Sequence, residues 1–263
     1  MDSETLLTIY AAVWLGVLGA VLGSFLDCAA ARYAAGGGWL PRGRSRCDAC
    51  GHILGAADLI PVVSWLLRRG RCRYCGAKIP ADCLWAELAG AALFAGLTVR
   101  FGLTAELAMW LLLGAALLAL ALVDGRTHEI PNGILLFAAA VRLAFLPLMD
   151  VPVLEQLAGM AVGALSVSAP LLVLSLVMDK ALGRESLGGG DLKLLFVLGL
   201  YMRWPEMLLL LLLGCLLALV WALLPGRDRR REIAFGPFLA AAWALTVLFG
   251  DGLIQWYQSL FVF

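Results

Sequence analysis

Long apolar runs recur along the whole chain, and no other feature limits its fold as strongly. We expect eight, at about 6–31, 83–101, 105–123, 130–148, 153–178, 192–202, 205–224 and 234–258. Roughly 20 apolar residues in a helix are enough to cross the hydrocarbon core of a bilayer. With 62% hydrophobic and only 15% charged residues, the composition excludes a single soluble core. The sequence therefore predicts an all-α polytopic membrane protein with about eight transmembrane segments.

The sixth run, 192–202, is too short for an upright span. A seven-segment alternative merges residues 192–224 into one helix kinked at Pro205, because membrane helices tolerate proline. The first run lacks the basic region of a cleavable secretory signal, and we interpret it as a first span.

Lysine and arginine gather in alternate loops, mainly within 32–78, 180–184 and 227–231. With eight segments these loops share one side, which the positive-inside rule assigns to the cytoplasm. The same count places Asp124, at the end of the third run, and Asp191, before the sixth, on that side. Charge bias and span parity thus predict that the two carboxyl groups meet.

Asp124 and Asp191 are the candidate catalytic residues. Asp191 follows Gly188, Gly189 and Gly190, which we expect to let a substrate chain approach closely because they carry no Cβ. Ionisable residues at membrane segments are costly and are often functional. Two carboxyl groups that share a proton can split a peptide bond, one acting as base and the other as acid. The alternative is a flexible loop with both aspartates solvating helix ends, and the short motif alone leaves it open.

Cysteines form two CxxC pairs, Cys47 with Cys50 and Cys72 with Cys75. Four thiolates at such spacing suit tetrahedral Zn²⁺, and a fully sulfur-ligated site leaves no position open for catalysis. We therefore predict a structural zinc ion that contributes to the folding free energy of this small loop. Redox chemistry is the alternative, which a reducing cytoplasm disfavours. The chain then divides into a first transmembrane segment (1–31), a cytoplasmic cysteine-rich zinc-binding loop (32–82) and a transmembrane aspartic peptidase domain (83–263).

Short motifs occur in a distinctive order along nearly the full length. They are Gly23-Ser24-Phe25-Leu26 with Arg32, the two CxxC pairs, Asp58-Leu59-Ile60-Pro61 with Ser64-Trp65-Leu66, Arg69-Gly70-Arg71-Cys72-Arg73, Glu87, Asp124 with Ile130-Pro131-Asn132, Gly188-Gly189-Gly190-Asp191-Leu192-Lys193, and Phe235-Gly236-Pro237-Phe238. In these motifs the chain resembles the bacterial type IV prepilin peptidases, the leader peptidase/N-methyltransferases of type IV pili and type II secretion.

This resemblance implies an aspartyl membrane protease of the GxGD type, in which Asp124 and Asp191 match the two catalytic aspartates. It implies cleavage of the basic leader from prepilins and pseudopilins on the cytoplasmic side of the bacterial inner membrane. It also implies methylation of the new N-terminal amine with S-adenosylmethionine, whose contacts the sequence does not assign. We expect membrane lipids as further partners and no nucleic acid; the oligomeric state stays open.

Asp27 stands where the family usually has asparagine, in the half of the chain tied to methylation. One alternative is therefore a peptidase without methyl transfer. Another is a non-catalytic membrane assembly factor whose zinc loop docks a partner. A proton-coupled transporter is a third class, but the pair of interrupted helices expected in matching halves is not visible.

Overall fold

The computed structural model describes residues 3–39, 44–183, 187–224 and 233–259. Within these ranges the chain is helical and has no strand, only two isolated β-bridges in the cysteine-rich loop. Short 3₁₀ turns cover Ala56–Asp58 and Leu146–Leu148. The α-helices are α1 (Ser3–Ala34), α2 (Val63–Leu67), α3 (Ala81–Phe101), α4 (Ala105–Thr127), α5 (Asn132–Ala144), α6 (Val153–Leu182), α7 (Gly189–Gly199), α8 (Trp204–Leu223) and α9 (Gly236–Ser259).

The eight expected apolar runs correspond in order to α1 and α3–α9, and α2 is an additional short helix. Six helices are long and apolar enough to cross a bilayer: α1, α3, α4, α6, α8 and α9. The prediction of an all-α multi-pass membrane protein is confirmed. Helices α5 and α7 have 13 and 11 residues, or about 20 and 17 Å of helix, less than the hydrocarbon thickness of about 30 Å.

The sixth and seventh runs form separate helices. Helix α7 ends at Gly199, Arg203 caps the N-terminus of α8, and Pro205 lies in the first turn of α8. Proline suits that position because its missing N–H would have no partner there. Pro205 therefore begins a helix and does not kink a merged one.

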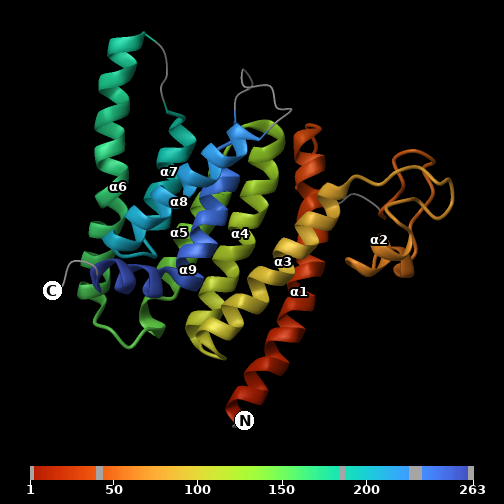
Figure 1. Cartoon of the computed structure of the whole chain (residues 1–263), viewed down its shortest axis with the longest axis horizontal. Coiled ribbons are helices and arrows are strands. Elements are labelled where there is room, and N and C mark those ends of the chain that lie inside the picture. Colours follow the sequence, from red (N-terminus) through yellow and green to blue (C-terminus); the bar gives the residue numbers. More distant parts are fainter. Residues whose placement is uncertain (1–2, 40–43, 184–186, 225–232, 260–263) are drawn as a thin grey trace. The chain divides into compact units, whose positions relative to one another are not determined.

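The chain divides into two compact units, residues 1–107 and 108–263. In the first unit α1 packs along α3, as Figure 1 shows. Gly19 and Gly23 make this close approach possible, because a Cβ on either would overlap a backbone carbonyl oxygen of α3, that of Gly90 or of Ala86. Small residues at such contacts let membrane helices approach closely and gain dispersion energy.

In the second unit α6 packs along α7, and α8 packs along α9 (Figure 1). Fully buried side chains include Leu120 on α4, Leu198 on α7 and Trp243 on α9. This packing positions α7 and α9, which carry two of the motifs singled out above. Among the basic loop residues, Arg42, Arg184 and the arginines of 227–231 lie outside the described residues.

Candidate active site and candidate metal centre

Asp124 lies in the last turn of α4, and only 4% of its surface is exposed. Its Oδ2 accepts a hydrogen bond of 2.9 Å from the backbone N–H of Gly236, the first residue of α9. The first N–H groups of a helix have no partner within the helix and favour a negative charge. The N-terminus of α9 therefore holds the Asp124 carboxylate in a fixed orientation.

Gly236 leaves the room that this carboxylate occupies. A Cβ on Gly236 would lie 2.6 Å from Oδ2 of Asp124 and 3.1 Å from Cδ2 of Leu120. Real Cβ atoms essentially never come within 3.0 Å of another heavy atom in this way. A larger residue at position 236 would therefore have to displace the carboxylate or the start of α9.

Asp191 lies in the first turn of α7, outside the six helices long enough to span. Gly188 caps this helix, Gly188 and Gly189 are exposed, and Gly190 is half-buried. A Cβ on Gly190 would meet Ile130 at 3.1 Å, whereas a Cβ on Gly189 would meet nothing within 4 Å. Gly190 thus packs against the segment before α5, and the backbone at Gly189 stays open to a second chain.

The two aspartates line one cavity of about 710 Å³. Burial, and after it the negative charge of Asp124, raise the pKa of Asp191 to about 6. When the charge of one carboxyl group raises the pKa of its neighbour in this way, the two groups titrate as a pair and can hold one proton between them. The cavity is lined by Asp124, His128, Glu129, Ile130, Asn132, Leu187, Gly188, Gly189, Gly190, Asp191, Lys193, Ile233, Ala234 and Phe235.

Four polar side chains of this cavity were not predicted as site residues: His128, Glu129, Asn132 and Lys193. His128 directly follows α4 with a positive φ of 56°. Lys193 donates a hydrogen bond of 3.2 Å to Oδ1 of Asn132. The sequence feature that could have identified these four residues is their proximity to the candidate pair, since each lies within eight residues of Asp124 or Asp191.

The four CxxC sulfurs lie within 4.8 Å of one another. The two CxxC turns have the same backbone pattern: Gly51 donates to the carbonyl of Cys47 at 2.8 Å and Gly76 to that of Cys72 at 3.0 Å. The sulfurs of Cys47 and Cys75 are 3.9 Å apart, close to the about 3.8 Å of a tetrahedron with Zn–S bonds of about 2.3 Å. Their thiols are free, so the donor set fits a tetrahedral metal ion. His52, which follows the first CxxC pair, stacks on Tyr74 with ring centroids 3.6 Å apart.

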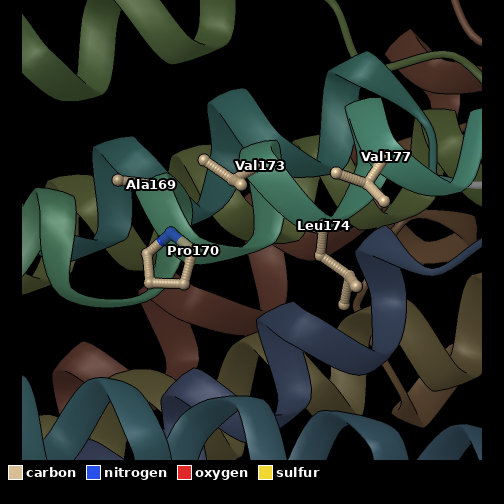
Figure 2. A pocket seen from close by; sticks show the side chains of 5 residues that line it. All are labelled: Ala169, Pro170, Val173, Leu174 and Val177. Atoms are coloured by element: carbon tan, nitrogen blue, oxygen red, sulfur yellow. The ribbon is translucent and has the colours of Figure 1, made fainter. Parts of the chain in front are cut away.

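A second hollow, of about 570 Å³, lies against α6 in the second unit. Figure 2 shows the apolar side chains that line it, with Pro170 inside the helix. The hollow has no acid, base or nucleophile that could act on a peptide bond. Its lining is Ala169, Pro170, Val173, Leu174 and Val177.

The fold and these sites define a multi-pass helical membrane protein with two carboxyl groups in one cavity and a separate four-cysteine cluster. Residues 17–101 match the bacterial peptidase A24 N-terminal domain, and residues 111–223 match the type IV leader peptidase family. The chain belongs to this family.

Similar proteins carry one name, prepilin leader peptidase/N-methyltransferase. The protein from Bacillus subtilis is 34% identical over 94% of this chain and 97% of its own length. The protein from Myxococcus xanthus is 35% identical over 95% of this chain and 76% of its own length. The protein from Aeromonas salmonicida is 33% identical over 82% of this chain and 75% of its own length. No solved structure shows a significant match. The resemblance given by the sequence motifs is confirmed.

Proposed function

We propose that this chain is a prepilin peptidase that removes the leader from type IV prepilins, with Asp124 and Asp191 as its catalytic pair. The observation that carries the proposal is the shared cavity, because residues 67 positions apart in sequence line it together. The family membership supports the reaction, and the names of the relatives support both leader cleavage and N-methylation.

In the proposed reaction Asp124 is the base and Asp191 the acid. Asp124 accepts a hydrogen bond from the amide of Gly236 at the N-terminus of α9, which orients its carboxyl group toward the cavity as the proton acceptor in this proposal. The pKa of Asp191, raised to about 6, leaves a larger fraction of this carboxyl group protonated near neutral pH than an ordinary aspartate would have. This division of roles follows from two carboxyl groups in different environments.

Asp124 takes a proton from water as the water oxygen attacks the scissile carbonyl carbon. Asp191 gives its proton to the carbonyl oxygen, which yields a neutral gem-diol. Collapse of the gem-diol returns a proton to Asp191 and breaks the C–N bond, and the leaving amine takes the proton held by Asp124. Both carboxyl groups then regain their starting states, so the step needs no further reactant.

The leader reaches the pair along Gly188–Gly190 in this proposal. The exposed backbone at Gly188 and Gly189 gives an extended peptide room beside Asp191. The apolar helix of the prepilin docks between membrane segments, which leaves the scissile bond at the mouth of the cavity. Pseudopilins of type II secretion are substrates of the same class in this proposal.

The four-cysteine cluster holds a structural Zn²⁺ in this proposal, through Cys47, Cys50, Cys72 and Cys75. Zinc binding to four thiolates would stabilise a loop that buries little apolar surface. S-adenosylmethionine is the methyl donor for the new N-terminal amine. The names of the relatives support this second reaction.

We place the protein in the bacterial inner membrane with the cavity facing the cytoplasm. The support is the sequence pattern: with all eight apolar segments crossing the membrane, the loops rich in lysine and arginine lie on the side of Asp124 and Asp191. The same basic loops favour contact with anionic lipid headgroups.

The test is cleavage of a purified prepilin by the wild type and by Asp124→Asn and Asp191→Asn. Each substitution keeps the shape of the side chain and removes its acid–base function, so kcat should fall by about 10²–10⁴-fold. Asp150→Asn, at an exposed loop acid, is the matched control and should cleave normally. Unchanged cleavage in both active-site variants would refute Asp124 and Asp191 as the catalytic pair. Absence of cleavage by the folded wild type would favour a non-catalytic assembly factor.

Methyl transfer is measured separately by mass spectrometry of the processed pilin in the presence of S-adenosylmethionine. A mass increase of one methyl group is expected. An unmodified amine would leave a peptidase alone. Asp27→Asn, which introduces the residue usual in the family, then tests whether Asp27 is the cause.

A further inference from the structure

A buried acid in the first unit takes no part in the proposed cleavage. Glu87 is 5% exposed and lies six residues after the start of α3 at Ala81. At 1.5 Å per residue it lies about 9 Å along the helix. Helix α3 has 21 residues, or about 32 Å, so it needs nearly all of its length to cross a core of about 30 Å. Glu87 therefore lies below the headgroups, in the outer part of the bilayer.

The partners of Glu87 come from its own helix and from the cysteine-rich loop. Its Oε2 accepts a hydrogen bond of 2.6 Å from the backbone N–H of Val62, and its Oε1 accepts one of 3.4 Å from the thiol of Cys83. Val62 immediately precedes α2. The hydrogen bond therefore holds the start of α2 close to the depth of Glu87. In Figure 1, α2 correspondingly lies level with the α1–α3 pair and not beyond its end.

The backbone at Val62 adopts a conformation that valine disfavours. Its φ is 62°, in the region that β-branched residues rarely occupy. Such a conformation persists where the surroundings enforce it. The hydrogen bond to Glu87 supplies that constraint at Val62, the residue directly before α2.

Apolar side chains around this turn are exposed. Leu66 and Leu67 on α2 keep 57% and 80% of their surface accessible, and Leu59, Ile60 and Val63 are exposed as well. We call residues 59–67 the anchor segment. A salt bridge of 2.6 Å joins Asp58 and Arg68, the residues that directly flank this segment. Exposed Arg69, Arg71 and Arg73 follow it directly.

We propose that the anchor segment inserts into the phospholipid monolayer beside α3, with its leucine and isoleucine side chains among the acyl chains. Three observations identify lipid as the occupant: the tether to an acid inside a span, the unpartnered apolar side chains, and the adjacent cations. Apolar residues beside arginines are typical of segments that lie in the membrane interface. The arginines contact lipid phosphates while their side-chain stems remain in the interface. The insertion holds the cysteine-rich loop against the membrane.

The test uses the full-length protein in nanodiscs of phosphatidylglycerol and phosphatidylcholine, part of it carrying a diazirine on the acyl chain. After illumination, the tryptic peptide 47–68 should carry lipid adducts, localised by fragmentation to residues 59–67. Peptide 74–78 of the same loop should carry none, and peptides from the spans give the reference level.

Adducts on 59–67 at the level of the span peptides are the expected result. Absence of adducts there, with the spans labelled, would overturn the proposal. Because the wild type alone decides this, the test does not depend on a variant that folds.

Two variants then test the cause. The double variant Leu66→Gln, Leu67→Gln should lower adduct formation on 59–67 several-fold. Glu87→Ala removes the acceptor for the Val62 amide and should lower it too, whereas Leu88→Ala, on the exposed neighbour in α3, should not. Equal labelling in the wild type and the double variant would refute insertion through these side chains.

Discussion

Replacing Gly236 by alanine should impair cleavage without unfolding the protein. The added Cβ would lie 2.6 Å from Oδ2 of Asp124, whereas ordinary van der Waals contact begins at 3.4 Å. The carboxylate or the first turn of α9 must therefore move by about 0.8 Å, the difference between these two distances. A misplacement of about 1 Å can cost about 10²-fold in rate, or about 2.7 kcal/mol of transition-state stabilisation.

The assay is kcat and KM for prepilin cleavage in detergent or nanodiscs, together with thermal unfolding. The matched control is Gly252→Ala in the same helix, since a Cβ on Gly252 would meet nothing within 4 Å. Alanine in place of glycine favours a helix by about 1 kcal/mol, so the control should be at least as stable as the wild type. We expect kcat to fall about 10²-fold in Gly236→Ala only. Wild-type kcat in that variant would refute the assigned role of the Gly236–Asp124 contact.

Three further predictions concern pH, metal and packing. Because Asp191 acts while protonated and its pKa is raised to about 6, kcat/KM should fall as pH rises through about 6; a midpoint near 4 would contradict the proposed acid. Cys72→Ser should lower the zinc content measured by elemental analysis and expose the loop to protease; full zinc retention would exclude this thiolate as a ligand. Gly19→Val should lower the melting temperature, because overpacking costs about 1–3 kcal/mol at the Gly90 contact; Gly159→Val, whose Cβ meets nothing within 4 Å, is the control.

The apolar runs were predictable because each membrane helix satisfies its backbone hydrogen bonds within its own segment. Their order, and hence the fold class, follows from local composition. The grouping of the four cysteines was also predictable from the sequence. Each CxxC pair forms a local turn, and because a tetrahedral metal ion needs four ligands, the two pairs are expected to come together. The break between α7 and α8 was harder to predict from the sequence, because a proline such as Pro205 can either kink a helix or begin one.

The surroundings of the candidate catalytic pair depended on tertiary structure. The motif at Gly236 was visible in the sequence, but its hydrogen bond to Asp124, 112 residues away, was not. The same holds for the bond between Val62 and Glu87, which lie on a loop and a span. Periodicity and composition report which face of a segment is apolar, whereas these contacts depend on which helices pack together and at what height. The sequence by itself thus determined the order of the apolar helices, the grouping of the four cysteines and the identity of the two aspartates as candidates. Tertiary packing alone decided that the aspartates share a cavity, that the N-terminus of α9 orients one of them, and that the cysteine-rich loop is tied to α3.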